Sequence, residues 1–335
     1  MKVTILGAGA FGLALAGVCS ENGYDVVAWD IDKEKCYEYQ KNRITPMFND
    51  YIIPDNINFT DDIKDAIKKS SLIIIAVPTQ FVRDVVKNMP PILSYQHICL
   101  TSKGIEKNTC LFSSDILKEK YRTRRIAVLS GPSFASDIVN GATAILSLAT
   151  KSRETNRLVK DILQNKRFKL MTTKDIKGVE AFGAAKNIMA IGAGMLEGQG
   201  LSATTKSSYF NSSLHDTKTL VKALGGDKKT MNSPAGVGDM HLTCGDKQSR
   251  NFNYGYLLGK NSSEEEIIEY VNNTTIEGLY TLKSIRKLIT NLDINIPIFD
   301  ILQGIVSGTN KIDDILEYLG TQNGPDIFGY VKKIK

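Results

Sequence analysis

Tryptophan, histidine and cysteine are scarce in this sequence of 335 residues, which contains one, three and five of them respectively. The cysteines form no CxxC pair and no Cys/His spacing of the kind that ligates zinc. Their odd number argues against a disulfide framework and favours reduced, packed thiols, as expected of a cytoplasmic protein. We therefore predict no structural disulfide and no metal site.

Long runs of one charge and long uninterrupted apolar runs are also missing. Lysine and arginine number 42 against 36 aspartates and glutamates, and the net charge of +6 is spread thinly. This pattern favours an anionic small molecule over nucleic acid as the partner. The most apolar stretch, residues 178–197, carries a lysine, an asparagine and several glycines, so we predict no membrane span. Residues 1–19 imitate a secretory signal, but they carry a more specific pattern.

That pattern is a glycine-rich turn in a defined context. An apolar strand is predicted at 2–6, the glycine motif GAGAFG follows at 7–12, and a helix is predicted at 13–22. The next predicted strand, 25–29, ends at an acidic residue, Asp30. A strand, GxGxxG, a helix and then an acid about 20 residues further on are typical of a dinucleotide-binding unit.

Each member of the motif has a specific expected role. Gly7 permits the tight turn, Gly9 lets the pyrophosphate approach the backbone, and Gly12 lets the helix pack closely on the strand. The pyrophosphate is expected at the helix N-terminus, where free N–H groups favour an anion. Asp30 is expected to accept hydrogen bonds from the adenosine ribose and to repel a 2′-phosphate.

The rest of the first half alternates strands with helices. Further strands are predicted at 72–77, 98–101, 126–129 and 143–148, and helices at 61–69, 80–88 and 154–164. This alternation predicts a doubly wound, Rossmann-type α/β domain over residues 1–177. Ligands bind such sheets at the carboxyl ends of the strands, which places Pro78, Lys103 and residues 131–133 at the rim where the nicotinamide would lie.

Strand signals largely stop after residue 178, and we predict an all-α domain over 178–335. Its first helix, 178–197, is dense in alanine and glycine and has apolar residues on every face, so it is expected to be buried. Burial lowers the pKa of a lysine, and a lysine tuned in this way can exchange a proton near neutral pH. Lys186 is therefore a catalytic candidate. Alternatively, its ammonium reaches the surface or pairs with Glu180 or another acid.

A second cluster of polar residues follows. Asp239 lies in a predicted glycine-rich loop, 225–240, where an acid often only bonds the turn backbone. Ser249, Arg250 and Asn251 precede a helical stretch, and a guanidinium beside a helix N-terminus suits a phosphate. A simple capped helix start on the surface is an equally good interpretation of this motif.

Taken together, the motifs resemble those of the NAD(P)-dependent glycerol-3-phosphate dehydrogenases of the prokaryotic type. The shared stretches occur in the same order and spacing nearly end to end. They are GAGAFGLALA at 7–16, IIAVP at 74–78, SKGIE at 102–106, SGPSFA at 130–135, GAAKNIMAIGAGM at 183–195, GVGDMHLTC at 236–244, QSRN at 248–251 and IEG at 276–278.

The resemblance implies roles for particular residues. Lys186 matches the catalytic lysine. Because negative charge grows on the carbonyl oxygen during reduction, we expect Lys103 to share its stabilisation and Asp239 to orient Lys186 or to accept a bond from the substrate hydroxyl. The substrate positions are Lys103, Gly131, Ser133, Lys186, Asp239, Ser249, Arg250 and Asn251. The cofactor positions that it implies are Ala10, Phe11, Lys103, Ala135, Arg250, Thr275 and Glu277, and the glycine motif described above adds Gly7, Gly9, Gly12 and Asp30.

The implied activity is the reversible reduction of dihydroxyacetone phosphate to sn-glycerol 3-phosphate, a phospholipid precursor, by a cytoplasmic homodimer. The chain departs from the family where Asp30 and Ile31 follow Trp29, at positions usually held by a small residue and then Arg or His. We therefore predict a preference for NAD(H), with NADP(H) still possible. A second departure, at Thr204, Ser212, Ser213 and Asp216, affects none of the proposed catalytic residues.

Two other functions are compatible with parts of this pattern. A ketopantoate-type reductase of 2-keto acids would share the nucleotide domain, the helical domain and a catalytic lysine. It would need a carboxylate site, whereas the QSRN stretch favours phosphate. A nicotinamide-binding redox sensor without catalysis would not need these catalytic and phosphate-binding side chains. The presence of Lys103, Lys186, Asp239 and Arg250 therefore argues against this function.

Overall fold

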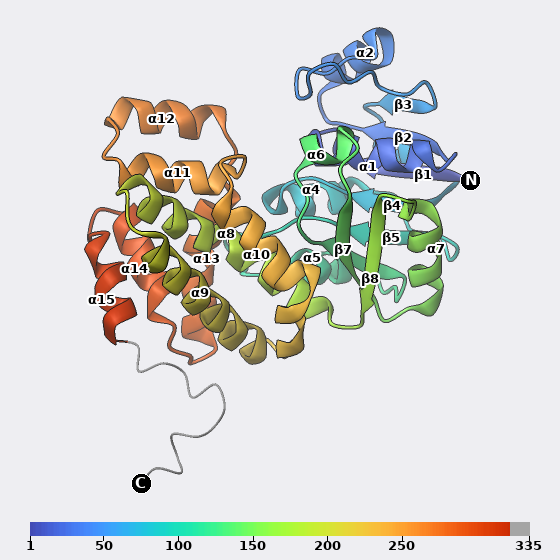
Figure 1. Ribbon diagram of the computed structural model, residues 1–335. Helices are drawn as coiled ribbons and strands as arrows, with labels where there is room; N and C mark the ends of the chain where they lie inside the picture. Colours follow the sequence, from blue (N-terminus) through green and yellow to red (C-terminus); the bar gives the residue numbers. More distant parts are fainter. Residues whose placement is uncertain (322–335) are drawn as a thin grey trace.

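The structure, a computed structural model, describes residues 1–321 and shows a sheet-containing part joined to a helical part (Figure 1). The predicted helical domain runs to residue 335, and its last residues, 322–335, lie outside the described range. In the described range, no helix combines the length and the apolar character needed to cross a membrane.

One eight-stranded sheet, ordered β3-β2-β1-β4-β5-β6-β7-β8, forms the centre of the first part. The strands are β1 (Lys2–Leu6), β2 (Asp25–Trp29), β3 (Ile57–Thr60), β4 (Ser70–Ile75), β5 (His97–Leu100), β6 (Ile126–Ser130), β7 (Ala144–Ala149) and β8 (Phe168–Thr173). All neighbouring pairs are parallel except β6 and β7, which are antiparallel. Six of these strands were predicted, whereas the edge strands β3 and β8 were not.

Helices cover both faces of this sheet. They are α1 (Ala10–Glu21), α2 (Lys33–Asn42), α3 (Ile63–Ile67), α4 (Thr79–Asn88), α5 (Ser113–Lys120), α6 (Ala135–Val139) and α7 (Arg153–Leu163). Apolar side chains of α1, α6 and α7 form the core on one face, and those of α3, α4 and α5 form the core on the other. The prediction of a doubly wound α/β domain is thereby confirmed.

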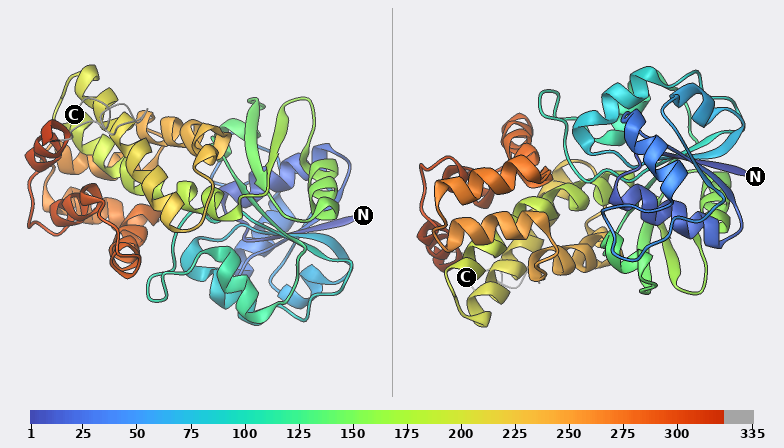
Figure 2. Two further views of the ribbon diagram at one scale, coloured as in Figure 1. Left: turned by 90° about the horizontal axis from the view of Figure 1, so that it is seen from below. Right: turned by 90° about the horizontal axis from the view of Figure 1, so that it is seen from above.

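The second part is helical, as predicted. Its α-helices are α8 (Ile176–Gly198), α9 (Ala203–Ala223), α10 (Asp239–Gly245), α11 (Arg250–Gly259), α12 (Glu264–Asn273), α13 (Glu277–Asn291), α14 (Pro297–Val306) and α15 (Asp313–Thr321). Both views of Figure 2 show this part beside the sheet-containing part, which carries the N-terminus at its far end.

Helix α8 is the central element of the helical part. Every residue from Gly178 to Leu196 is buried, and the helix packs most extensively against α11. A Cβ on Gly255 would lie 1.9 Å from the carbonyl oxygen of Ile191, and one on Gly194 would lie 2.0 Å from that of Phe252. Only glycine at these positions lets the two backbones approach so closely. Because β8 ends at Thr173 and the side chains of α8 from Ala181 onward belong to a separate core, we propose that the domains divide here, near residues 177 and 178.

The prediction of a loop over residues 225–240 is wrong, because most of this segment is helical. A 3₁₀-helix (Lys228–Asn232) and a π-turn (Pro234–Gly238) occupy most of it, and Asp239 is the first residue of α10. Pro234 stands at the first position of the π-turn, where its fixed φ favours a helical start. Asp239 is therefore held by a helix rather than by a flexible turn.

Candidate active site

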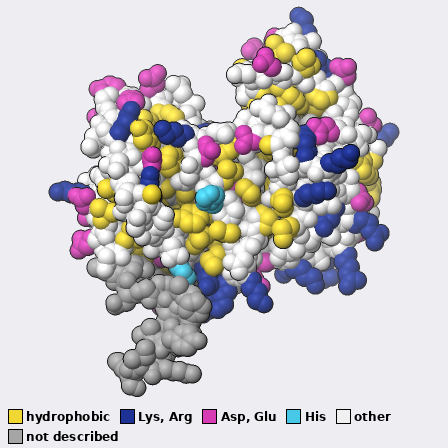
Figure 3. Space-filling view, viewed as in Figure 1, with side chains coloured by type: hydrophobic (Ala, Val, Ile, Leu, Met, Phe, Trp, Pro, Cys, Tyr) yellow, Lys and Arg dark blue, Asp and Glu magenta, His cyan; other side chains and the backbone are white. Residues whose placement is uncertain are grey.

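A cleft of about 480 Å³ lies between the two parts of the molecule. The space-filling view shows the surface hollowed between the lobe with α11 and α12 and the lobe with α2 and β3 (Figure 3). From the first part, the lining includes the turn at Gly9–Phe11 and the ends of β4 and β5 at Pro78 and Lys103. From the helical part it includes Lys186 and Asp239. The fold thus brings the glycine-rich turn and the candidate lysine of α8 to one cavity.

Two lysines share one carboxylate in this cleft. Lys186 Nζ lies 2.8 Å from Asp239 Oδ1, and Lys103 Nζ lies 2.8 Å from Asp239 Oδ2. Asp239 is 1% exposed and Lys186 is 7% exposed. The acid that pairs with Lys186 is therefore Asp239. Glu180, the other partner considered from the sequence, accepts hydrogen bonds from the Ser114 backbone and hydroxyl instead.

The charges in this cluster shift one another's pKa values. Burial lowers the pKa of Lys103 to about 8; the Asp239 carboxylate opposes this shift, and the nearby Lys186 ammonium adds to it. Burial alone would raise the pKa of Asp239, but the two ammonium groups outweigh that effect and hold it below its ordinary value. The site therefore contains a stably ionised carboxylate and a lysine that can release a proton near neutral pH.

Thr243 completes the surroundings of Lys186. It lies four residues after Asp239 on α10, so both side chains lie on the same side of the helix. Lys186 Nζ donates to Thr243 Oγ1 at 2.7 Å, and that hydroxyl donates to the backbone oxygen of Asp239 at 2.6 Å. Sequence reasoning missed Thr243. A prediction of a helix over residues 239–243 would have placed it beside the Asp239 carboxylate.

A chain of amide hydrogen bonds fixes the lysines relative to one another. Asn187 donates to the backbone oxygen of Lys103 at 2.9 Å, and Asn251 donates to Asn187 Oδ1 at 3.0 Å. Asn251 Oδ1 in turn accepts from the N–H of Gly278 at 2.9 Å. These bonds tie the loop after β5 to α8, α11 and α13. Asn251 therefore has a structural role in addition to the substrate contact predicted for it.

The glycine-rich turn fits a dinucleotide. Gly7 has φ +111°, and a Cβ on Gly12 would lie 1.9 Å from the carbonyl oxygen of Gly7, so both positions require glycine. A Cβ on Gly9 would meet nothing within 4 Å, so its backbone is open to a ligand. Gly9 is also the N-cap residue of α1. Because no side chain caps this helix, its first backbone N–H groups are available for a phosphate. Ala10 and Phe11 line the cleft just beyond.

Most of the remaining predicted residues line the same cleft, whereas Asp30 and Gly131 do not. Ser133, Ala135, Ser249, Arg250 and Asn251 line it. Gly131, at the end of β6, accepts a hydrogen bond from Lys103 Nζ at 3.0 Å. The hydroxyl of Ser249 caps α11 by accepting from the N–H of Phe252, as the capped-helix interpretation expects, but Ser249 is buried and not at the surface. Arg250, in contrast, is exposed at the cleft.

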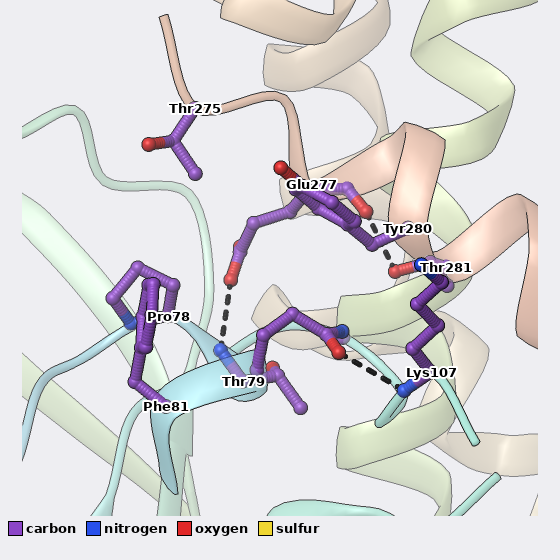
Figure 4. Close-up of a pocket in the computed structure, with 10 residues that line it drawn as sticks. Pro78, Thr79, Phe81, Lys107, Thr275, Glu277, Tyr280 and Thr281 are labelled. Carbon is purple, nitrogen blue, oxygen red and sulfur yellow. Dashed lines mark hydrogen bonds between the residues drawn. The ribbon is translucent and has the colours of Figure 1, made fainter.

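A smaller pocket of about 240 Å³ adjoins the cleft. Thr275 and Glu277 line it together with Pro78, Thr79 and Phe81 at the start of α4. Figure 4 shows Glu277 reaching from α13 to the backbone N–H of Thr79, an interaction of 3.3 Å. Burial raises the pKa of Glu277, and that N–H group and the nearby cations partly offset the rise. Since Pro78 and Glu277 also line the cleft, we assign this pocket to the same site.

Sequence reasoning also missed Met47 and Phe48, which line the cleft from the segment between α2 and β3. Thr204, Ser212, Ser213 and Asp216, where the chain departs from the family, lie on α9 and are not part of the lining. Within residues 1–321, no three His, Cys, Asp or Glu side chains gather in a way that could hold a metal ion.

Comparisons with known proteins agree with this geometry. Residues 2–156 match the model of the NAD-dependent glycerol-3-phosphate dehydrogenase N-terminus, and residues 175–317 match that of the C-terminus. A glycerol-3-phosphate dehydrogenase [NAD(P)+] of Fusobacterium nucleatum is 30% identical over 91% of this chain and 92% of its own length. The enzyme of the same name from a Thermoanaerobacter species is 33% identical over 98% of this chain and all of its own.

A solved structure is also similar along nearly the whole chain. The glycerol-3-phosphate dehydrogenase of Coxiella burnetii superimposes with a TM-score of 0.90 and 28% sequence identity. The match covers 96% of this chain and 99% of that one. With both family models matched in order and a paired-lysine cleft between the parts that they describe, the chain belongs to the NAD-dependent glycerol-3-phosphate dehydrogenase family.

Proposed function

We propose that this protein reversibly reduces dihydroxyacetone phosphate to sn-glycerol 3-phosphate with a nicotinamide cofactor, which provides a precursor of phospholipids. The observation that carries the proposal is the placement of Lys186 and Lys103 on the two oxygens of Asp239, each at 2.8 Å, in the cleft that also contains the glycine-rich turn. A carbonyl group bound between that turn and these ammonium groups would have two cations near its oxygen, where negative charge develops during reduction.

The chain's own residues account for the binding of the cofactor. The α1 N-terminus and the open backbone of Gly9 would hold the pyrophosphate, and Asp30 would face the adenosine ribose. When bound, the nicotinamide supplies or accepts the hydride. Its ring would lie at the ends of β4 and β5, beside Pro78 and Lys103, with Glu277 on the opposite wall.

Negative charge develops on the carbonyl oxygen as it is reduced, and fixed cations stabilise that charge in a site with little water. Lys186 is held by Asp239 and Thr243, so we propose that it donates the proton to this oxygen. Lys103 contributes a second positive charge. Asp239 keeps the two ammonium groups close together, which their mutual repulsion would otherwise oppose.

The phosphate group of the substrate would bind at the start of α11. The exposed guanidinium of Arg250 matches a phosphate in shape and charge, and the helix N-terminus adds partial positive charge. Anchoring the phosphate there would hold the carbonyl carbon in position for hydride transfer. Gly131 and Ser133, at the end of β6, would form the opposite side of the substrate site.

The test is the oxidation of NADH and NADPH by the purified protein, measured side by side with dihydroxyacetone phosphate and with ketopantoate. We expect turnover only with the triose phosphate. We also expect a preference for NADH of about tenfold, which corresponds to roughly 1.4 kcal/mol, because Asp30 repels a 2′-phosphate. Reduction of ketopantoate alone would overturn the proposed substrate, and tighter use of NADPH would overturn the cofactor preference.

We further propose that the enzyme acts in the cytoplasm as a homodimer, as the family resemblance implies. The free thiols support the first of these proposals, since all five cysteines are unpaired and four of them are buried.

A further inference from the structure

The acid that ends β2 has a partner that sequence reasoning did not consider. Lys35, in the first turn of α2, places its Nζ 2.7 Å from Asp30 Oδ2. The side chain of Asp30 is 14% exposed and that of Lys35 is 22% exposed, so water screens the pair only in part. Among residues 1–321, Lys35 is the only basic side chain that forms an ion pair with Asp30.

Two backbone groups also bind this carboxylate. The N–H of Ala8, in the glycine-rich turn, donates to Asp30 Oδ2 at 3.0 Å, and the N–H of Asp32 donates to Oδ1 at 3.2 Å. A carboxylate has about four acceptor positions, two on each oxygen. With Lys35 and Ala8 on Oδ2 and Asp32 on Oδ1, about one position on Oδ1 remains for a ribose hydroxyl while Lys35 stays paired. Lys35 therefore competes with the ribose for this carboxylate and offsets part of its charge.

These contacts change the electrostatic interaction of this site with the 2′-phosphate of NADPH. An unpaired Asp30 would repel it strongly, whereas Lys35 carries a positive charge to the same place. The lysine stem is flexible, so its ammonium can turn from the carboxylate toward a phosphate next to it. Lys33, on the same turn, is exposed and forms no ion pair among the described residues.

We propose that Lys35 is a cofactor-selectivity residue, which offsets the charge of Asp30 and donates to the 2′-phosphate of NADPH, so that the enzyme binds a cofactor that Asp30 alone would exclude. The inference rests on the proposed function only in placing a nicotinamide dinucleotide in the cleft. It would explain how a chain with an acid at this position could bind both cofactors.

The test compares Lys35→Met with the matched control Lys33→Met, by equilibrium binding of NADH and NADPH. The same variants are titrated with 5′-AMP and with adenosine 2′,5′-bisphosphate, which fill only the adenosine end. Trp29 is the sole tryptophan and directly precedes Asp30, so its fluorescence reports binding of these two ligands. In Lys35→Met we expect both 2′-phosphorylated ligands to bind about tenfold more weakly and the other two to change by less than about threefold.

Further variants separate this role from a merely structural one. Lys35→Arg should retain the affinity for NADPH, and Asp30→Asn combined with Lys35→Met should recover part of it, because the repelling charge is then gone. Equal weakening of all four ligands in Lys35→Met, or no change in any, would overturn the inference. If the wild-type protein binds neither dinucleotide, the proposed function fails instead.

Discussion

Lys186→Ala should reduce kcat by roughly a thousandfold or more while leaving the affinity for NADH nearly unchanged. The alanine removes both the proposed proton donor and one of the two cations beside the carbonyl oxygen. Most residues expected to hold the dinucleotide, such as Gly9 and Asp30, lie on the sheet-containing part. The hydrogen-bond partners of Lys186 among the described residues are instead Asp239 and Thr243. Steady-state turnover with dihydroxyacetone phosphate, together with a fluorescence titration of NADH, separates the two effects.

A matched control lies on the same helix. Lys177, near the start of α8, is about one-third exposed and pairs with Asp115. Lys177→Ala should therefore leave kcat within about twofold of wild type. If turnover survives in Lys186→Ala, Lys186 is not the proton donor. Lys103, whose pKa is lowered to about 8, would then be the better assignment.

Asp239→Asn should damage both stability and activity. The wild-type carboxylate has an ammonium group on each oxygen and is almost completely buried. An amide keeps the shape but leaves two buried positive charges without a counter-charge, which typically costs about 3–5 kcal/mol of unfolding free energy. We also expect kcat to fall by at least about a hundredfold, because the lysines repel each other out of position. Denaturant unfolding and turnover assays measure the two losses.

The dependence of stability on pH gives this variant a specific signature. Because the pKa of Lys103 is about 8 in the folded protein and ordinarily 10.5, the unfolded chain binds more protons between these values, and stability rises with pH there. Loss of the carboxylate lowers this pKa further, so in Asp239→Asn the rise should begin below pH 8. The stability deficit relative to wild type should therefore shrink as the pH approaches about 8. Asp246→Asn, at the end of α10, is the control and should lose less than about 1 kcal/mol at every pH. A deficit independent of pH would contradict the proposed charge balance.

The sequence carried the dinucleotide unit clearly because its signals are local. Gly7, Gly9 and Gly12 stand at fixed spacing between a strand and a helix, and the structure shows the backbone reason for each of them. The central strands were predicted because burial on both faces makes them continuous apolar runs. The edge strands β3 and β8 lack such runs, since each has a neighbour on one side only, so composition did not reveal them.

The site itself depends on contacts that the sequence could not specify. Lys103 and Asp239 are 136 residues apart, and only the family resemblance placed them together before the fold did. Thr243 was missed because its relation to Asp239 depends on a helix where the glycines indicated a loop. The Asp30–Lys35 pair was missed because the acid was considered without its neighbours on α2, although only five residues separate the two.

The central claim is that the helical part presents the ammonium of Lys186 to a triose phosphate held against a dinucleotide on the other part. A crystal structure of the protein with NADH and dihydroxyacetone phosphate, or with an unreactive analogue of the triose, tests it most directly. We predict that Lys186 Nζ lies about 3 Å from the carbonyl oxygen, with the phosphate group at Arg250 and the start of α11. A complex in which Lys186 points away from the bound triose, or in which the triose binds outside the cleft, would contradict the account.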